Sequence, residues 1–360
     1  MTETRPPAAI LAVDGGNSKV DLVLAAADGT VLACLRGPTV SHQQIPLEEG
    51  LERLESLIDR ALAEAGLAVG VRPAAAYGVF CLAGADSPTD ERMLDSALAA
   101  RHLTAHGMLR NDAFAALRAG TDRTWGVAII GGAGINAVGV APNGDVARFA
   151  ALGRISGDKG GGEEVGWQGL AAAARARDGR GGPTTLERLV PEYFGLATPE
   201  DVTNAFYADL LAEDAVRGLA PIVLGAAHAG DAEAQAIVAS MADEVIAFAA
   251  GAIRRLDLSS TDVVVTLAGS IMRNAGPAFQ SRVESGVRSI APAATVVTLD
   301  ALPVTGAALL ALDQLEIVDR PAAETRLRGG IAASSIASGG AAAGAVTGAG
   351  PAERILPPGT

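Results

Sequence analysis

The first glycine-rich loop of this chain connects two strands, and this connection limits the folds that the chain can adopt. In "AVDGGNSKVDLVL", residues 12–24, an apolar run ends at Asp14, two glycines follow, and the sequence then becomes apolar and alternating again. This pattern predicts two antiparallel strands joined by a hairpin. Glycine loops of the dinucleotide-binding or Walker type lead instead into a helix whose N-terminus receives phosphate. A ligand of this loop would therefore be held by a hairpin.

The opening pattern recurs from Trp125. The segment "WGVAIIGGAGINAVGVAPNGDVARFAALG" contains an apolar strand, a glycine loop, a second strand, an Asn143-Gly144 turn and a third strand. The first copy has a corresponding turn at Asp28-Gly29. Internal repetition of this kind indicates a repeated structural unit. We therefore predict an α/β fold with two copies of one domain, which face their glycine loops across a cleft.

The remaining pattern predicts how the chain divides. After its three strands, the first copy alternates helices and strands as far as "RNDAFAALRAG". The second copy continues with a glycine-rich stretch, several helices, the strands "DVVVTLAGS" and "ATVVTL", and a helix around "VTGAALLALDQL". From residue 320 the chain is rich in Gly, Ala and Ser without periodicity, and such a segment buries too little side chain to offset its ordering entropy. We predict an N-terminal domain over 1–112, a C-terminal domain over 113–319 and a flexible tail over 320–360.

Composition excludes several classes of partner. A chain of 360 residues with 49% hydrophobic residues can bury a sizeable core, whereas its net charge of −13 argues against nucleic acid and anionic membranes as partners. No uninterrupted apolar run approaches a membrane span and no signal peptide is evident, so we expect a cytoplasmic protein. Cys34 and Cys81 lie in strand-like runs and are expected to be buried free thiols. The four histidines show no metal-binding spacing.

Several motifs in a fixed order resemble one protein family. Asp14-Gly-Gly-x-Ser-Lys, Asn111-Asp112, Gly132-x-Gly134 and Ala268-Gly269-Ser270 are similar to the motifs of the sugar kinase–Hsp70–actin superfamily. Within it, "CLAGADSPTD", "RNDAFAAL", "GDKGGGEEVGWQGLAAAARARDGRGGPTTLERL" and "PVTGAALLAL" resemble the N-acetylglucosamine kinase and BadF/BadG-type ATPase family. The resemblance covers nearly all of residues 8–315.

The resemblance implies two ribonuclease-H-like, actin-like ATPase domains flanking a nucleotide cleft. It implies an ATP-dependent carbohydrate kinase that uses ATP and Mg²⁺ and transfers the γ-phosphate to a hydroxyl of an amino sugar or hexose. N-acetylglucosamine and glucosamine are the first sugars to consider. The expected partners are the small-molecule sugar and a second copy of the chain in a homodimer.

The two hairpins are the predicted phosphate-binding elements, because their backbone N–H groups can form anion-binding nests. Asp14 ends a buried strand, where a carboxylate needs a partner, and Mg²⁺ is the natural one. Each loop could also be an ordinary hairpin, Lys19 a solvated strand residue, and the Gly269 region a plain strand-to-helix turn. The predicted nucleotide contacts are Gly15, Gly16, Asn17, Ser18, Lys19, Gly131, Gly132, Gly134, Gly269 and Ser270.

Asp112 is the predicted catalytic residue. The resemblance places a general base here, and phosphoryl transfer needs one carboxylate to accept the proton of the attacking hydroxyl. The alternative is that Asp112 is the N-cap of the helix that follows it. The resemblance further implies sugar contacts from Asn111, Asp112, Gly84, Asn136 and Asp158.

Several residues depart from the family pattern. The second loop reads "GGAGIN", so Ala133 and Ile135 stand where relatives often carry Thr and Ser, and two hydroxyl contacts with phosphate are absent. The segment "SHQQ", residues 41–44, stands where N-acetylglucosamine kinases carry a segment similar to Thr-Asn-His. Glu163 and Glu164 could pair with the ammonium of an unacetylated amino sugar, or could simply begin a helix, where the helix dipole favours acidic residues.

Two other functions remain open from the sequence. One is the ATPase that activates a radical acyl-CoA dehydratase, which carries an iron–sulfur cluster at a dimer interface and needs closely placed cysteines; Cys34 and Cys81 do not provide them. The other is a non-catalytic nucleotide-binding module. The presence of both Asp14 and Asp112 argues against the second possibility.

Overall fold

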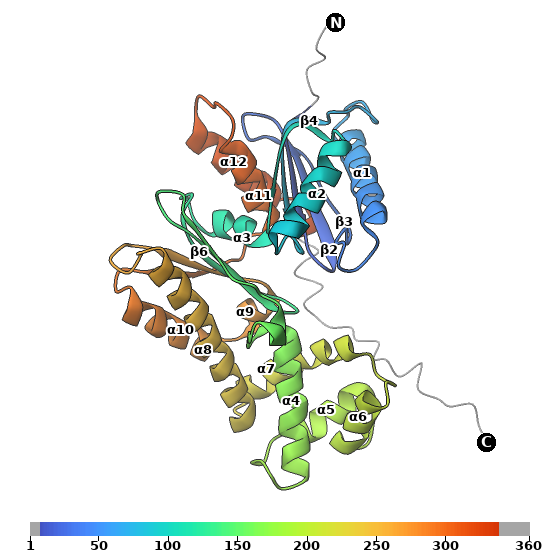
Figure 1. Ribbon diagram of the computed structural model, residues 1–360, viewed down its shortest axis with the longest axis vertical. Coiled ribbons are helices and arrows are strands. Elements are labelled where there is room, and N and C mark those ends of the chain that lie inside the picture. Colours follow the sequence, from blue (N-terminus) through green and yellow to red (C-terminus); the bar gives the residue numbers. More distant parts are fainter. Residues whose placement is uncertain (1–7, 338–360) are drawn as a thin grey trace, which may run out of the picture. The chain divides into compact units, whose positions relative to one another are not determined.

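The computed structural model describes residues 8–337, which form two compact units (Figure 1). Within the described chain, the first unit comprises residues 8–128, 142–144 and 299–337, and the second comprises 129–141 and 145–298. Strand β6 (Gly126–Gly131) spans the boundary between 128 and 129. Each unit is built around a five-stranded sheet with helices, which confirms the predicted α/β class.

The sheet of the first unit has the order β3-β2-β1-β4-β5. The first three strands pair antiparallel, as the hairpin pattern predicts, whereas β4 is parallel to both β1 and β5. These strands are β1 (Ala8–Gly15), β2 (Lys19–Ala25), β3 (Val31–Pro38), β4 (Ala75–Leu82) and β5 (Thr104–Arg110).

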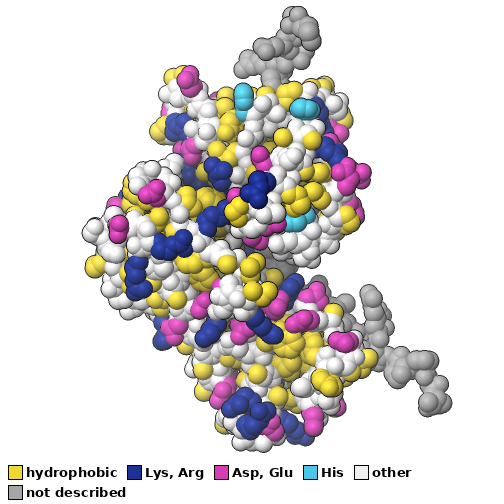
Figure 2. Space-filling view, in the orientation of Figure 1, with side chains coloured by type: hydrophobic (Ala, Val, Ile, Leu, Met, Phe, Trp, Pro, Cys, Tyr) yellow, Lys and Arg dark blue, Asp and Glu magenta, His cyan; other side chains and the backbone are white. Residues whose placement is uncertain are grey.

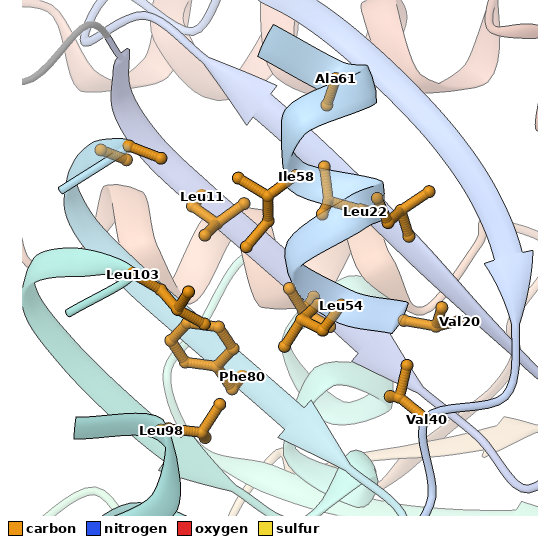
Figure 3. Close-up of a cluster of buried hydrophobic side chains, with 14 of the residues drawn as sticks. Leu11, Val20, Leu22, Val40, Leu54, Ile58, Ala61, Phe80, Leu98 and Leu103 are labelled. Atoms are coloured by element: carbon orange, nitrogen blue, oxygen red, sulfur yellow. The ribbon is translucent and has the colours of Figure 1, made fainter. Parts of the chain in front are cut away.

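Helices α1 (Leu47–Glu64) and α2 (Pro88–Ala100) cover one face of this sheet. The apolar residues of α1 recur at helical spacing, so Leu54 and Ile58 point together into the core. They pack against Leu11 and Leu22 of the strands, while Phe80 of β4 fills the space towards α2 (Figure 3). Alternate residues of each strand face this core and the others face the opposite side.

The opposite face of the first sheet is covered by helices from distant parts of the sequence: α3 (Asp112–Gly120), α11 (Val304–Leu312) and α12 (Arg320–Ala332). In Figure 1 the orange and red helices at the end of the chain lie beside the blue strands at its beginning. Ile10 and Ala12 of β1 contact this layer. The predicted domain division is therefore wrong for three segments, because residues 113–128, 142–144 and 299–319 cluster with the first unit. A central sheet with two apolar faces needs a helical layer on each, and the chain returns to supply the second one.

The predicted flexible tail is wrong for residues 320–337. Helix α12 begins after Asp319, whose carboxylate caps it by accepting a hydrogen bond from the backbone N–H of Ala322. Ala323, Leu327 and Ile331 are fully buried at helical spacing and pack into the second-face core. Three apolar residues on one stripe suffice here because the rest of the core is already built. The part of the predicted tail from 338 to 360 lies outside the described residues.

The sheet of the second unit has the order β10-β9-β6-β7-β8. Numbered from β6, this is the order of the first sheet read from its other edge, so the predicted internal repeat is confirmed at the level of topology. Besides β6, its strands are β7 (Ile135–Val140), β8 (Val146–Arg148), β9 (Val264–Ala268) and β10 (Thr295–Thr298).

A long helical insertion separates β8 from β9 in the second unit. Its α-helices are α4 (Gly161–Arg177), α5 (Leu186–Phe194), α6 (Pro199–Tyr207), α7 (Ala220–His228) and α8 (Ala232–Arg255), with short 3-10 turns at Gly153–Ile155 and Glu213–Leu219. Two further helices, α9 (Ser270–Asn274) and α10 (Pro277–Ile290), lie between β9 and β10.

Helix α8 is the one helix in residues 8–337 whose length and composition would also fit a membrane span, with a mean hydropathy of 1.7. Such a match is weak evidence, because the core helix of a folded domain meets the same criteria. Here 56% of the apolar window is buried within the structure, and α8 packs against α10, α7 and α4. Packing inside its own unit therefore accounts for the apolar character of α8.

Candidate active site

The carboxyl ends of four strands of the first sheet lie at one edge. β1, β4 and β5 are parallel, and β3 runs in the same direction because it is antiparallel to β2, which is antiparallel to β1. In α/β sheets ligands bind outside the carboxyl ends of the strands. The predicted residues of the first unit all lie at this edge: Asp14, Gly15, Gly16, Asn17, Ser18, Lys19, Gly84, Asn111 and Asp112.

Asp14 lies at the end of β1, opposite Asp21 of β2 and Cys81 of β4 in the strand register. Asp21 is buried and receives two hydrogen bonds from the guanidinium of Arg36, at 2.6 and 2.8 Å, so its charge is compensated. The pKa of Asp14 is raised well above its ordinary value, first by burial and then by the neighbouring charges of Asp112 and Asp21. Asp14 is therefore a carboxylate that a bound cation would stabilise strongly.

The loop after Asp14 is a tight hairpin with exposed polar side chains. The backbone N–H of Gly16 donates to the carbonyl of Lys19 at 2.9 Å, and Thr39 Oγ1 donates to the carbonyl of Gly16 at 2.8 Å. Asn17, Ser18 and Lys19 are exposed, and Lys19 Nζ lies 3.9 Å from Asp21 Oδ2. The closed hairpin thus holds a hydroxyl and an ammonium group at the same edge as Asp14.

The structure at the start of α3 bears on whether Asp112 is the N-cap of this helix. Asn111 is the N-cap, because its Oδ1 accepts a hydrogen bond from the backbone N–H of Ala113 at 3.0 Å. Asp112 is the first residue of the helix and is half-buried. Burial, followed by the charge of Asp86, raises the pKa of Asp112 to about 6, although the backbone N–H of Ala113 opposes the shift. The capping alternative is therefore wrong, since the neighbouring asparagine provides the cap.

The glycine hairpin of the second unit is also closed by a backbone hydrogen bond. The backbone N–H of Gly132 donates to the carbonyl of Gly134 at 2.9 Å. The start of α4 packs onto this loop: Gly162 N–H donates to the carbonyl of Gly132 at 2.8 Å, and Glu163 N–H donates to that of Ala133 at 2.9 Å. Gly161 has a φ of +80°, and a Cβ there would lie 2.4 Å from the Gly134 backbone. Glycine is therefore required for this contact.

A pocket of about 240 Å³ opens beside this hairpin, lined by Gly134, Asp158, Glu163 and Glu164 among others. Asp158 Oδ2 accepts hydrogen bonds from Ser156 Oγ at 2.6 Å and from the backbone N–H of Gly153 at 3.0 Å, so this oxygen holds the loop in shape. The other predicted residue here, Asn136, lies in β7 and accepts a hydrogen bond from the N–H of Ala137 at 2.7 Å.

The predicted nucleotide motif at Gly269 and Ser270 contacts the glycine hairpin that begins at Gly131. Gly269 follows β9 with a φ of +96°, and a Cβ there would lie 2.0 Å from the carbonyl oxygen of Gly131. Ser270 begins the short helix α9. A second pocket, of about 500 Å³, opens beyond the end of α9 and is lined mainly by apolar side chains, including Val238, Ala239, Ala278 and Phe279, with Gln235 and Arg282 as polar groups. Its volume falls in the range of small-molecule binding pockets.

The predicted site residues thus fall into two sets, one in each unit. The second set consists of Gly131, Gly132, Gly134, Asn136, Asp158, Gly269 and Ser270. Among residues 8–337, no group of three or more His, Cys, Asp or Glu side chains forms a metal centre. Mg²⁺ does not require one, because it binds through one or two carboxylates together with substrate phosphates and water. Asp14, whose raised pKa reflects an uncompensated carboxylate, fits that mode.

Sequence reasoning missed Asp86, which is part of the quoted motif "CLAGADSPTD". Its carboxylate accepts a hydrogen bond from Asn111 Nδ2 at 2.9 Å. Ser87 and Asp90, which follow it, form the capping box of α2. A capping box is visible in the sequence, and it accounts for Ser87 and Asp90 but not for Asp86.

The two matching sheets, each with the strand order of the ribonuclease H fold, define a protein of the actin-like ATPase class. The sequence profile of the BadF/BadG/BcrA/BcrD ATPase family matches residues 11–311, and the chain belongs to this family.

Two curated relatives are sugar kinases. The chain is 27% identical over 266 residues to the N-acetylmuramic acid/N-acetylglucosamine kinase of Clostridium acetobutylicum, covering 74% of this chain and 86% of the relative. It is 24% identical over 319 residues to the N-acetyl-D-glucosamine kinase of Dictyostelium discoideum, covering 84% of this chain and 97% of the relative.

The fold is also similar to two crystal structures of candidate N-acetylglucosamine kinases. The structure from Chromobacterium violaceum matches with a TM-score of 0.67 and 24% identity over 84% of this chain and 99% of its own. That from Porphyromonas gingivalis matches with a TM-score of 0.59 and 20% identity over 85% of this chain and 99% of its own. At these identities the likeness concerns the fold.

Proposed function

We propose that this chain is an ATP-dependent kinase that phosphorylates a hydroxyl of an amino sugar, with N-acetylglucosamine as the first candidate. The observation that carries the proposal is Asp112, a half-buried carboxylate at the first position of α3 whose pKa is raised to about 6. A group with this pKa is ionised at neutral pH and accepts a proton more readily than an ordinary aspartate does. The named relatives, which are amino-sugar kinases, support the same class of substrate.

In the proposed reaction Asp112 accepts the proton of the attacking sugar hydroxyl. The hydroxyl oxygen forms a new bond to the γ-phosphorus of ATP, the bond from that phosphorus to the β,γ-bridging oxygen breaks, and ADP leaves with the electron pair. The products are the sugar phosphate, ADP and a proton on Asp112 that passes to solvent. Lys19, exposed at the edge of the first sheet, is assigned to the negative charge of the phosphates.

Asp14 is assigned to Mg²⁺, which would neutralise phosphate charge when bound. The proposal rests on the raised pKa of this carboxylate and on its nearness to a second carboxylate. Asp21 is less suited to this role, because Arg36 already compensates its charge.

The nucleotide is assigned to the glycine motifs. The hairpin of the second unit contains Gly131, Gly132 and Gly134, and without side chains there its backbone N–H groups can come close to a phosphate. Gly15 and Gly16 provide the same in the first unit. Gly269 and Ser270 are assigned to the adenosine. The apolar pocket that opens after α9 supports this assignment, since it offers aliphatic side chains to a purine.

The sugar contacts are assigned to Asn111, Gly84, Asn136 and Asp158, together with Asp112. The two acidic residues at the start of α4 already have partners in the structure, so they give no reason to prefer glucosamine over a neutral sugar. Glu163 Oε2 accepts hydrogen bonds from the guanidinium of Arg217 at 2.9 and 3.2 Å, and Glu164 accepts one from Gln168 at 2.9 Å. A carboxylate already paired with arginine offers little attraction to the ammonium of an unacetylated sugar.

The iron–sulfur alternative finds no support in the positions of the cysteines. Cys34 and Cys81 are buried in β3 and β4, which are separated in the sheet by β2 and β1. Because neighbouring strands are about 4.8 Å apart, the two strands are about 14 Å apart, too far for two ligands of one cluster. We propose a cytoplasmic homodimer as the working form, which sedimentation of the purified chain would test.

The test is sugar-dependent ADP release by the parent chain and by Asp112→Asn. We expect turnover with N-acetylglucosamine, a lower kcat/KM with glucosamine, and a loss of about 10²- to 10⁴-fold in kcat for Asp112→Asn, the usual contribution of a general base. ATP binding should persist in the variant. The control is Asp95→Asn, the same chemical change on the exposed side of α2. Normal turnover by Asp112→Asn, or no sugar dependence in the parent, would refute the proposal.

A further inference from the structure

Asp86 connects two segments that carry predicted site residues. One oxygen of its carboxylate accepts a hydrogen bond from Asn111 Nδ2 at 2.9 Å, and the other accepts one from Gln43 Nε2 at 3.1 Å. Asn111 is the N-cap of α3, the helix that begins with Asp112. Gln43 belongs to the loop 39–44 that follows β3. One carboxylate therefore bridges the start of α3 and this loop.

The loop is in turn attached to the first glycine hairpin. Asn17 Nδ2 donates to Gln43 Oε1 at 3.3 Å, and Ser41 Oγ donates to Asn17 Oδ1 at 2.6 Å. Ser41 is buried, so this end of the chain of hydrogen bonds is shielded from solvent. The continuous series runs from the hairpin through the loop and Asp86 to the cap of α3.

The backbone also brings the loop against the turn that carries Asp86. Gly84 has a φ of +88°, and a Cβ at this position would lie 2.6 Å from the ring of His42 and 3.1 Å from the side chain of Gln43. Only glycine permits both the backbone conformation and this approach. The backbone at Gly84 therefore fixes the approach of the loop to this turn, and the exposed hydrogen bond between Gln43 and Asp86 forms beside that contact.

The capping box of the next helix does not use Asp86. Helix α2 begins with Ser87 as its N-cap, and Ser87 and Asp90 satisfy each other's backbone N–H groups in a capping box. Asp86 precedes this box and is not needed for it. Its two oxygens are directed instead to Asn111 and Gln43.

Asp86 also determines which way the Asn111 amide is turned. The Asn111 oxygen must accept from Ala113 N–H for the helix to be capped, and its nitrogen must then find an acceptor, which Asp86 supplies. If Asn111 turned over, the cap would be lost and the first turn of α3, with Asp112 at its start, would loosen.

We propose that Asp86 is a positioning residue for the kinase reaction: its carboxylate fixes the Asn111 cap, and hence Asp112, relative to the loop 39–44 and the glycine hairpin. The inference rests on the proposed function. Displacement of a reacting group by about 1 Å can cost about 100-fold in rate, so hydrogen bonds of modest strength can matter for kcat.

A hydrogen-bond exchange between residues 43 and 86 tests this role. Asp86→Asn places an amide nitrogen opposite the Gln43 amide nitrogen, and Gln43→Glu places a carboxylate opposite the Asp86 carboxylate, so each single change breaks the bridge. In the double variant Gln43→Glu/Asp86→Asn, the Asn at 86 donates to the Glu at 43. The acceptor for Asn111 Nδ2 and the acceptor for Asn17 Nδ2 are both kept.

We expect each single variant to lose about 10- to 100-fold in kcat with little change in the KM for ATP, and the double variant to recover to within about threefold of the parent. Rates are normalised to the folded fraction from circular dichroism, and Asp95→Asn is the matched control. Parent-like kcat in Asp86→Asn, or a double variant no better than the poorer single one, overturns the proposal.

The same four proteins are compared by thermal unfolding without substrates. A non-additive, compensating effect in the double variant supports the bridge whether or not the parent has kinase activity, and additive effects refute it. Failure of the proposed function is seen separately, as a parent chain that releases no ADP in response to any sugar.

Discussion

Replacing Asp112 by Asn should stabilise the protein at neutral pH even though it is expected to abolish turnover. The carboxylate of Asp112 is desolvated at the start of α3 and lies near the negative charge of Asp86. The substitution keeps the shape of the side chain and an acceptor for the N–H of Ala113, but it removes the charge. The substitution also removes a repulsion from Asp14, because the charge of Asp112 raises the pKa of Asp14.

The magnitude follows from the pKa of Asp112. A rise from the ordinary 3.8 to about 6 corresponds to about 3 kcal/mol of unfavourable free energy for the ionised folded protein, at about 1.4 kcal/mol per unit. Partial exposure of the carboxylate and the favourable effect of a negative charge at a helix N-terminus reduce the net gain to about 2 kcal/mol. This gain corresponds to a rise of about 4–8 °C in the Tm of a unit of this size.

The size of the effect changes with pH in a defined window. Above the folded pKa of about 6, Asp112 is charged in both the folded and the unfolded chain and the full penalty applies. Below the ordinary 3.8 it is neutral in both states and the penalty vanishes. The stability difference between Asp112→Asn and the parent should therefore be largest at about pH 8 and nearly absent at about pH 4.

The assay is thermal unfolding followed by circular dichroism across this range, without ATP or Mg²⁺, because a cation near Asp14 would compensate the charge. Asp95→Asn, on an exposed surface, should show little change at any pH. A Tm of Asp112→Asn equal to or below that of the parent at about pH 8 would contradict the reasoning. So would a gain of the same size at about pH 4.

Two further predictions concern packing. Leu327→Ala should cost about 2–5 kcal/mol of unfolding free energy, because Leu327 is fully buried in α12, whereas Thr325→Ala on the exposed side of the same helix should be nearly neutral in chemical denaturation; equal effects would show that α12 does not dock. Gly269→Ala should abolish ATP binding measured by calorimetry and lower the Tm, because its Cβ would lie 2.0 Å from the carbonyl oxygen of Gly131. Gly225→Ala in α7, where a Cβ meets nothing within 4 Å, is the control.

The strand pattern of the sequence was sufficient for the antiparallel hairpins of both sheets, whereas the complete domain fold was implied only by the family resemblance. The hairpin after Asp14 and its repeat after Gly131 place the first two strands of each copy side by side, and the third strand follows from each Gly-containing turn. The strand order then repeats because both copies continue with helix and strand in the same sequence. Local turn chemistry and alternation carry this information, and both are visible in the residues themselves.

The local sequence pattern does not predict which unit the last helices pack against. Helix α11 is apolar on all sides, which indicates that it is buried, but not in which unit. In α12 the apolar stripe consists of Ala323, Leu327 and Ile331 among glycines, alanines and charged residues, so its periodicity is weak. It is stable as a helix because the second face of the first sheet offers a surface to cover, which is a tertiary effect.

Asp86 escaped prediction for a different reason. Its partners, Gln43 and Asn111, lie 43 and 25 residues away in sequence. Only the parallel arrangement of β1, β3, β4 and β5 brings the ends of these strands to one edge. Polar networks of this kind depend on the complete sheet and leave no periodic signal in the sequence.

Helix α3 has a destabilising charge at its first residue and several stabilising hydrogen bonds near its last residues. Its first residue, Asp112, carries the desolvated charge, whereas Arg118 near its end is buried and donates hydrogen bonds to Asp313 at 2.9 and 3.1 Å and to Glu324 of α12 at 2.8 Å. Arg328 of α12 donates to the carbonyl of Ala119 at 2.9 Å, and so satisfies one of the last acceptors of the helix.

This arrangement gives the C-terminal helix a role that its position in the sequence does not suggest. Removing one partner of a buried ion pair costs about 3–5 kcal/mol, because the other charge is left uncompensated. The contacts of α12 with Arg118 and Ala119 therefore tie the end of α3 to α12. A substitution that loosens α12 should then weaken the placement of Asp112 as well as the core of the first unit.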